Sequence, residues 1–152
     1  MTKIMVVAGE VSGDMHAARV VQELKKERPD LEFFGMGSDE LGKQGVEILF
    51  DPTQISTIGF VEALKHLRKF YKLLDMLSRE IDRRKPDLLF LVDYSGFNMK
   101  MAKIGRQKGV PVVNYFSPSA WVWGEWRAKR MAKYGARIAA VFPMEVDIYK
   151  KH

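Results

Sequence analysis

The sequence predicts an α/β fold: a Rossmann-like parallel sheet with helices on both of its faces. Short apolar runs of strand length alternate along the chain with longer segments of helical periodicity, and this alternation is typical of βα repeats. The apolar runs are almost continuous, as in parallel strands that are buried on both faces. The 152 residues contain no internal repeat and no linker. We therefore expect one domain, since this length is ordinary for a single core.

The first half of the chain opens with a clear strand and a clear helix. An apolar run ends at Gly9. The helical pattern that follows stops at Pro29, because a proline disfavours helical geometry in the residue before it. The expected elements are a strand at Ile4–Ala8, a helix at His16–Glu27, a strand at Leu31–Gly35, and a short helix and a short strand within 38–58, the strand around Val46–Phe50.

The second half continues the same alternation. Its clearest strand is a run of five apolar residues that is entered through Lys85-Pro86-Asp87 and followed by Asp93. The expected elements are a long helix at about Phe60–Arg84, a strand at Leu88–Val92, a helix at Lys100–Lys108, a strand at Val110–Phe116, a helix at Arg127–Tyr134, a strand at Arg137–Phe142, and a helix that begins near Glu145.

Composition excludes several classes of function. The chain has no cysteine, which excludes disulfides, thiolate metal sites and a cysteine nucleophile. The three histidines lie far apart in the sequence, so we expect no metal and no cofactor. Glu10 interrupts the first apolar run too early for a signal peptide, and no run approaches the roughly 18 apolar residues of a membrane span. The net charge of +6 favours anionic partners without choosing among them.

The turn after the first strand is the first candidate site, because ligands bind beyond the carboxyl ends of strands in open α/β sheets. It reads Gly9-Glu10-Val11-Ser12-Gly13-Asp14. This turn is neither a G-x-G-x-x-G fingerprint nor a Walker A loop. A plain strand-to-helix turn, capped by Ser12 or Asp14, remains an open alternative. Glu10 argues against that alternative, because an acid at this place has no packing purpose.

Two further strand ends carry candidate chemistry. Asp93 follows the central strand, where a carboxylate can act as a general base or can simply cap the next helix. The third edge holds Trp121, Trp123 and Trp126 within one loop. Three indoles in a loop favour sugar stacking or anchoring at a membrane interface over core packing.

These residues resemble a known family. Ala8-Gly9-Glu10-Val11-Ser12-Gly13-Asp14 resembles the opening signature A-G-E-x-S-G-D of the lipid-A-disaccharide synthases. Further matches follow in the family's order: Phe34-Gly35-Met36-Gly37, Ile58-Gly59-Phe60-Val61-Glu62, Lys85-Pro86-Asp87, Asp93 with Phe97-Asn98, Ser117-Pro118 with Trp121 and Trp123, and Phe142-Pro143 with Glu145 and Tyr149.

The resemblance implies an inverting glycosyltransferase (a hexosyltransferase) of the GT-B type, in which two Rossmann-like domains face each other across a cleft. Such enzymes transfer a diacylglucosaminyl group from UDP-2,3-diacylglucosamine to 2,3-diacylglucosamine 1-phosphate without a metal, forming the β-1,6-linked lipid A disaccharide and releasing UDP. By position, Asp93 is then the expected catalytic base and Glu10 a second essential acid. The expected substrate-binding residues are Gly9, Ser12, Gly13, Asn98, Ser117, Trp121 and Glu145.

The sequence departs from the family pattern in three places. The usual D-x-P-D-F-N reads Asp93-Tyr94-Ser95-Gly96-Phe97-Asn98 here, and the usual P-F-E reads Pro143-Met144-Glu145. The first change removes a possible rival of Asp93 as the base. The third departure is that the resemblance covers only the acceptor-side domain, residues 1–152. We expect the nucleotide-sugar-binding C-terminal domain to be absent from this chain, with a separate chain as one source of it. We also expect no turnover by residues 1–152 alone.

The long helix is the expected membrane contact. Leu64, Leu67, Tyr71, Leu74 and Leu77 form one apolar face that we expect to pack on the sheet. Basic residues on the other faces are typical of a helix at an anionic lipid surface. Together with this helix, the resemblance implies a cytoplasmic protein that is peripheral at the inner face of the inner membrane. The expected lipid contacts are Phe60, Val61, Leu64, Lys65, Arg68, Lys69 and Phe70.

Three alternatives remain beside the enzyme. A nucleotide-binding or flavodoxin-like domain has the same βα rhythm, and a non-catalytic module could bind lipid A precursors. A nucleic-acid partner is not expected, because acidic residues such as Glu62, Asp75, Glu80 and Asp82 are interleaved with the basic ones and no continuous basic stripe emerges. A second basic group, Arg127, Lys129, Arg130 and Lys133, could meet the acceptor phosphate or be solvated helix surface.

Overall fold

The computed structural model describes residues 2–54, 60–92, 95–115, 129, 132–135, 137–139 and 150, with the backbone alone at 54, 60–66, 95, 138 and 139. Its elements confirm the predicted alternation of strands and helices. They are β1 (Lys3–Ala8), α1 (Val11–Glu27), β2 (Glu32–Met36), α2 (Asp39–Lys43), β3 (Glu47–Phe50), the 3₁₀ helix η1 (Pro52–Gln54), α3 (Phe60–Arg84), β4 (Leu88–Val92), α4 (Ser95–Gln107), β5 (Val112–Tyr115) and β6 (Arg137–Ala139).

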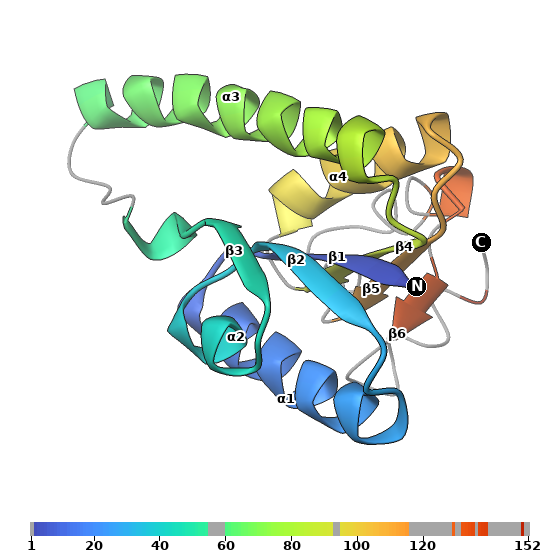
Figure 1. Cartoon of the computed structure of the whole chain (residues 1–152). Helices are drawn as coiled ribbons and strands as arrows, with labels where there is room; N and C mark the ends of the chain where they lie inside the picture. The colour runs from blue at the N-terminus through green and yellow to red at the C-terminus, as the bar shows by residue number, and fades with distance from the viewer. Residues whose placement is uncertain are drawn as a thin grey trace.

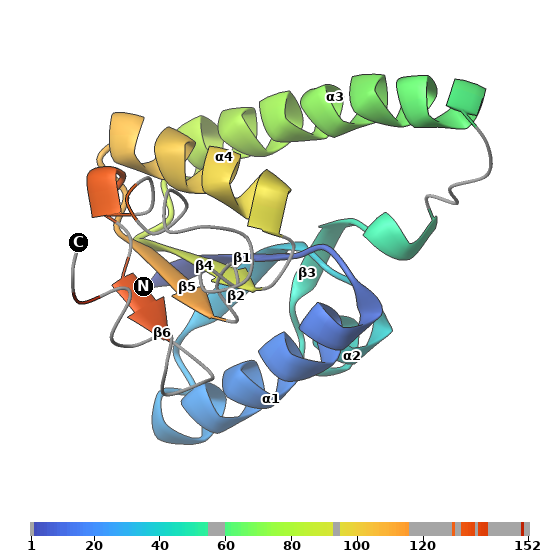
Figure 2. The same cartoon turned by 180° about the vertical axis from the view of Figure 1, so that it is seen from behind.

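The strands form one parallel sheet in the order β3-β2-β1-β4-β5-β6. Helices α1 and α2 cover one face of this sheet, and α3 and α4 cover the other (Figures 1 and 2). This arrangement is the classic Rossmann strand order described for dinucleotide-binding folds. The predicted Rossmann-like fold is therefore confirmed.

Successive side chains of each strand enter two different cores. In β1, Met5 and Val7 belong to the core under α3 and α4, whereas Ile4, Val6 and Ala8 belong to the core under α1. Because both faces are covered, every one of these positions must be apolar. The continuous apolar runs in the sequence are the direct consequence.

The glycine that ends the second apolar run permits a close contact between β1 and β2. Gly35 has φ +146°, and a Cβ built there would lie 2.0 Å from the carbonyl oxygen of Val6. The strand register with β3 also shifts between Gly35 and Met36. No side chain fits at this position, which explains why the segment Phe34-Gly35-Met36-Gly37 carries a glycine there.

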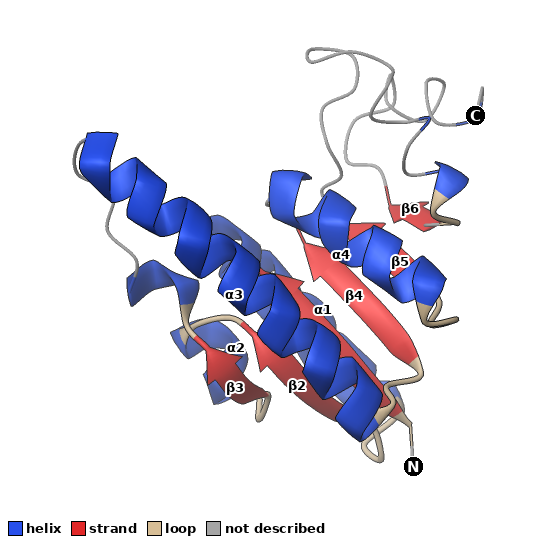
Figure 3. Ribbon diagram, turned by 90° about the horizontal axis from the view of Figure 1, so that it is seen from above, coloured by secondary structure: helices blue, strands red, loops and turns tan. Residues whose placement is uncertain are grey.

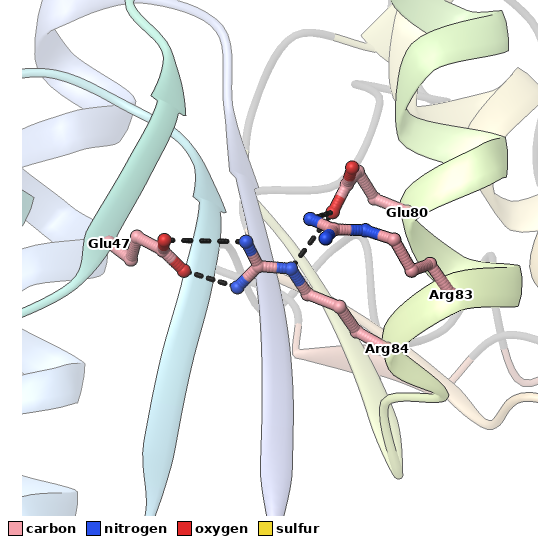
Figure 4. Close-up of polar contacts among 4 residues, drawn as sticks. All are labelled: Glu47, Glu80, Arg83 and Arg84. Carbon is pink, nitrogen blue, oxygen red and sulfur yellow. Dashed lines mark hydrogen bonds and ion pairs between the residues drawn. The ribbon is translucent and has the colours of Figure 1, made fainter.

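An arginine joins the C-terminal end of α3 to the edge of the sheet. Arg84 pairs with Glu47 of β3 through both terminal nitrogens, and its Nε donates to Glu80 at 2.8 Å (Figure 4). The guanidinium also lies 4.9 Å from the centre of the Phe34 ring. The hydrogen bond from Arg84 holds the pKa of the Glu47 carboxyl below its usual value. This contact fixes the position of α3 over β2 and β3.

Two predicted helix starts were wrong. The first helix begins at Val11 instead of His16, and the fourth begins at Ser95 instead of Lys100. In both places a glycine-containing segment that reads as a turn forms the first helical turns. In α4 these turns carry Phe97, whose side chain is 1% exposed in the core. Burial of that ring offsets the weak helical propensity of the segment.

Candidate functional site

The sheet has one topological switch point, between β1 and β4. From β1 the chain continues through α1 on one face of the sheet, and from β4 it continues through α4 on the other face (Figure 3). Ligands of open α/β sheets bind beyond the carboxyl ends of the strands at such a point. The two strands end in register there, since Ala8 pairs with Val92.

Glu10 lies at this switch point. It is the N-cap residue of α1, has extended backbone geometry and makes no side-chain capping hydrogen bond. Its side chain is exposed. The carboxylate is thus exposed at the end of β1 and makes no capping hydrogen bond to α1.

Asp93, the expected base, lies outside the described residues. The residue before it, Val92, is the last residue of β4 and is fully buried. The strands that precede Glu10 and Asp93 are neighbours, are parallel and end at the same edge of the sheet. This is the strand arrangement that a shared site for the two carboxylates requires.

The glycine-rich turn divides into exposed and buried parts. Ser12 is exposed beside Glu10 in the first turn of α1, and Gly9 connects the strand to the helix. Gly13 is buried, so it serves the packing of the helix and does not line an open surface. Ser12 and Glu10 are thus the exposed members of the predicted set in the segment that follows β1.

Asn98 occupies a different place from the one we expected. Its side chain is 0% exposed, and its Nδ2 donates to the carbonyl oxygen of Val92 at 3.2 Å. The amide therefore fastens the start of α4 to the end of β4 from behind the rim. A direct contact between Asn98 and a substrate is not supported, because no part of the side chain reaches the surface.

Asp14 is a site residue whose contacts the sequence did not reveal. Its carboxylate is buried and does not cap α1; it accepts hydrogen bonds from the backbone N–H groups of Ser38, Glu40 and Leu41 at 2.7, 3.0 and 3.3 Å. The N-cap residue of α2, Ser38, gives its own hydroxyl to Asp51 instead. The sequence did contain one sign of this contact, the glycine at position 37. A Cβ at Gly37 would lie 3.2 Å from the Asp14 carboxylate.

Several predicted residues lie outside the described part of the chain. These are Ser117, Trp121 and Glu145 of the substrate-binding set, together with Trp123, Trp126, Arg127 and Arg130. Of the second basic group, Lys129 and Lys133 are described, and both are exposed.

The long helix turns a different face to solvent from the one we predicted. Leu74 and Leu77 are buried as expected, but Leu67 and Tyr71 are 53% and 52% exposed. Phe70, expected to meet lipid, packs instead on the core, with its ring 5.0 Å from that of Phe97. The prediction failed because α3 is longer than the sheet beneath it. The helix has 25 residues and is about 37 Å long, roughly twice the length of a five-residue strand, so part of its apolar face has no sheet to pack on.

The exposed part of α3 carries a shallow open depression of about 480 Å³, lined by Leu67, Arg68, Tyr71, Lys72 and Asp75. The Nζ of Lys100 lies 5.7 Å from the centre of the Tyr71 ring. Arg68 and Lys69 are exposed as predicted, and the side chains of Phe60, Val61, Leu64 and Lys65 are not described. Apolar and basic side chains thus share one surface of the helix.

The described residues hold no group of three or more His, Cys, Asp or Glu side chains arranged to bind a metal ion. No helix within the same residues has the length and apolar character needed to cross a bilayer.

Comparison with known proteins identifies the family. The family profile described as lipid-A-disaccharide synthetase matches residues 4–152. The lipid-A-disaccharide synthase of Geobacter metallireducens is 42% identical over 149 residues, covering 98% of this chain and 39% of that protein. The synthase of Myxococcus xanthus gives the same identity and coverage. The chain thus spans about two fifths of the length of these curated relatives.

Solved structures agree on the fold. A UDP-N-acetylglucosamine 2-epimerase superposes with a TM-score of 0.68 at 14% identity, covering 99% of this chain and 44% of that one. MurG of Acinetobacter baumannii superposes with a TM-score of 0.60 at 13% identity, covering 95% of this chain and 42% of that one. At these identities the likeness establishes the fold alone, the one found in half of a GT-B enzyme. From its match along almost the whole length, the chain belongs to the lipid-A-disaccharide synthase family.

Proposed function

We propose that this chain is the acceptor-side domain of a lipid-A-disaccharide synthase. In this proposal the complete enzyme transfers a diacylglucosaminyl group from UDP-2,3-diacylglucosamine to 2,3-diacylglucosamine 1-phosphate. The observation that carries the proposal is the placement of the family's signature at the switch point, with Glu10 exposed there and the strand before Asp93 ending beside it. A nucleotide-sugar-binding domain outside residues 1–152 would complete the cleft.

The proposed chemistry needs one base on the acceptor side. Asp93 takes the proton from the 6-hydroxyl of the acceptor sugar as that oxygen attacks the anomeric carbon of the donor. The bond between that carbon and the UDP oxygen breaks, UDP leaves with the electron pair, and attack from the opposite side inverts the anomeric centre. Glu10, one strand away, orients the acceptor by accepting hydrogen bonds from its hydroxyl groups.

The acceptor is a lipid, and α3 offers a surface for its membrane. The first turns of α3 project beyond the carboxyl ends of the neighbouring strands (Figure 3), on the edge where the acceptor is proposed to bind. Leu67 and Tyr71 of the same helix are exposed, as are the basic residues Arg68, Lys69 and Lys72. Basic residues near anionic lipid add roughly 1 kcal/mol each, so we place the protein at the inner face of the inner membrane.

A chimeric enzyme tests the proposal. Residues 1–152 would replace the matching part of the Geobacter metallireducens synthase, and release of UDP would be measured with both lipid substrates. We expect turnover by the chimera and none by residues 1–152 alone. Asp93→Asn in the chimera should lower kcat by about 10²- to 10⁴-fold, because the base is lost.

The matched control is Asp82→Asn, a change of the same kind at an exposed carboxylate of α3 that pairs with Lys108. This control should keep the activity of the unsubstituted chimera. Equal activity of the Asp93→Asn and Asp82→Asn chimeras would overturn the assignment of the base.

A second candidate is a module that binds lipid A precursors without catalysis, which the exposed apolar and basic side chains of α3 would serve equally well. The two candidates differ in one result. A binding module would hold diacylglucosamine 1-phosphate in isolation, but its chimera would release no UDP.

A further inference from the structure

We propose that Asp14 is a positioning residue: its buried carboxylate holds the first turn of α1, which carries Glu10 and Ser12, in place by fastening it to the start of α2. The role in acceptor binding rests on the proposed function, whereas the coupling between the two segments rests on the contacts of Asp14 alone. Asp14 closes the A-G-E-x-S-G-D signature, and the proposed chemistry does not otherwise use it.

Both carboxylate oxygens of Asp14 accept hydrogen bonds from the backbone. The residue is 3% exposed. Its Oδ1 accepts from the N–H groups of Ser38 and Leu41, and its Oδ2 accepts from the N–H of Glu40. Hydrogen bonds to an ionised acceptor are about twice as strong as neutral ones. These three N–H groups lie at the start of α2, where the backbone N–H groups have no partner within the helix. The side chain of the N-cap residue of α2, Ser38, makes no capping hydrogen bond to them.

The first turn of α1 needs such an external support. It contains Gly13, and glycine weakens a helix by roughly 1 kcal/mol relative to alanine. The N-cap residue, Glu10, makes no side-chain hydrogen bond to the turn. The backbone N–H of Asp14 donates to the carbonyl oxygen of Glu10 at 2.9 Å, so the anchored residue is tied directly to the proposed site residue.

The opposite side of the contact is shaped to admit the carboxylate. Gly37 is buried, and a Cβ there would lie 2.4 Å from Cδ1 of Leu41 and 3.2 Å from Oδ1 of Asp14. An alanine at this position would press on the Leu41 side chain of α2 and on the Asp14 carboxylate of α1. Asp14 and Gly37 thus form one contact from two sides, and substitution of either residue should disturb the same pair of segments.

Amide hydrogen exchange on residues 1–152 tests the coupling. In Asp14→Asn and in Gly37→Ala, exchange at Ser38 and Leu41 should accelerate roughly tenfold to hundredfold. Exchange in the first turn of α1 should accelerate together with exchange at Ser38 and Leu41. In Gly37→Ala this includes the backbone amide of Asp14. Asp30→Asn is the matched control, because its carboxylate is exposed and pairs with Arg28; it should change neither segment.

The result that overturns the proposal is faster exchange in α2 with unchanged exchange in the first turn of α1, since Asp14 would then only cap α2. If either variant fails to fold, the exchange of the unsubstituted chain decides. The amides of Asp14, Ser38 and Leu41 should then open as one unit with matching protection. Protection at Asp14 that differs at least tenfold from that at Ser38 and Leu41 would contradict the coupling.

Kinetics of the chimera test the consequence for the site. Asp14→Asn should raise the KM for the acceptor at least tenfold and leave the KM for the UDP donor unchanged. Partial unfolding would reduce the amount of active enzyme and would move neither KM, so an unchanged acceptor KM contradicts the positioning role. An inactive unsubstituted chimera would instead reject the proposed function, while the exchange measurement would still decide whether Asp14 couples the two segments.

Discussion

At the scale of single residues, the signature positions divide into exposed ones, which we propose bind the acceptor, and buried ones, which hold the backbone in place. Glu10 and Ser12 are exposed at the switch point, whereas Gly13 and Asp14 are buried. Gly35 belongs with the second group, because the backbone of β1 lies directly against it. In this chain the motif therefore combines the exposed residues of the proposed site with buried residues that hold the surrounding segments in place.

Gly35 gives a direct test of the second group. Gly35→Ala would place a Cβ 2.0 Å from the Val6 carbonyl oxygen, at a φ of +146°. We expect the free energy of unfolding to fall by at least about 2 kcal/mol, because both the clash and the backbone strain act together. Urea denaturation followed by circular dichroism measures this change.

The control for that experiment is Gly42→Ala. Gly42 lies in α2, and a Cβ there would approach only Ile48, at 3.9 Å. This substitution should leave the stability unchanged or slightly higher, since alanine favours helix. Equal effects of the two substitutions would contradict the close approach of β1 and β2.

At the scale of elements, the two halves of α3 have different structural roles. Its C-terminal half is held over the sheet by the buried side chains of Leu74, Leu77 and Ile81 and by the pairing of Arg84 with Glu47 of β3. Its N-terminal half extends past the strand ends (Figures 1 and 3), and Leu67 and Tyr71 are exposed near the boundary between the two. The C-terminal half therefore contributes to stability, and the N-terminal half provides the proposed lipid surface.

The arginine contact at the end of α3 should depend on pH. Arg84→Ala should lower the free energy of unfolding by about 1–2 kcal/mol near neutral pH, since it removes a partly buried ion pair and the contact with the Phe34 ring. Arg79→Ala, at an exposed pair on the same helix, should cost less than about 0.5 kcal/mol. Urea denaturation at several pH values gives both numbers.

The direction of the pH dependence follows from the pKa shifts. Hydrogen bonds from Arg84 to Glu47, and from Arg83 and Arg84 to Glu80, lower the pKa of each carboxyl below the ordinary 4.5. Such groups stabilise the fold above that value and lose their contribution as the pH falls through the lowered pKa. The difference between the unsubstituted chain and Arg84→Ala should therefore shrink below about pH 4.5; a difference that grows on acidification would contradict the ion-pair account.

The proposed lipid surface has its own test at this scale. Leu67→Ser should weaken sedimentation of the chain with anionic vesicles at low salt and should leave its stability nearly unchanged, because the side chain is 53% exposed. Leu24→Ser is the matched control, an exposed leucine on α1 across the sheet. Equal losses for both variants, or no loss for Leu67→Ser, would reject α3 as the lipid contact.

At the scale of the whole molecule, the sequence was informative wherever the signal is local. The strands and the covered sheet follow from continuous apolar runs such as Ile4–Ala8, because only burial on both faces requires that pattern. The start of α1 was misplaced because its support comes from contacts with Ser38 and Leu41, 24 or more residues away. The exposed face of α3 was missed because periodicity does not report where the sheet beneath a helix ends.

The candidate site was predictable in part: the sequence indicated the position of Glu10 but not the burial of Asn98. The general rule for strand ends placed Glu10 at the rim, and the structure puts it there. The burial of Asn98 was not predictable from its position in a motif, since a side chain in the first turns of a helix can face either the rim or the core. Motif membership therefore identifies residues that matter, and the structure decides how each one acts.

The central claim is that the ends of β1 and β4 form one acceptor site. Titration of isotopically labelled residues 1–152 with 2,3-diacylglucosamine 1-phosphate in detergent, followed by backbone amide NMR, tests it most directly. We expect the largest shifts in the segment from Gly9 to Ser12 and in the residues that follow Val92, with saturation at one common concentration. Shifts confined to α2 and β3, or two segments that saturate at different concentrations, would contradict a single site at this edge of the sheet.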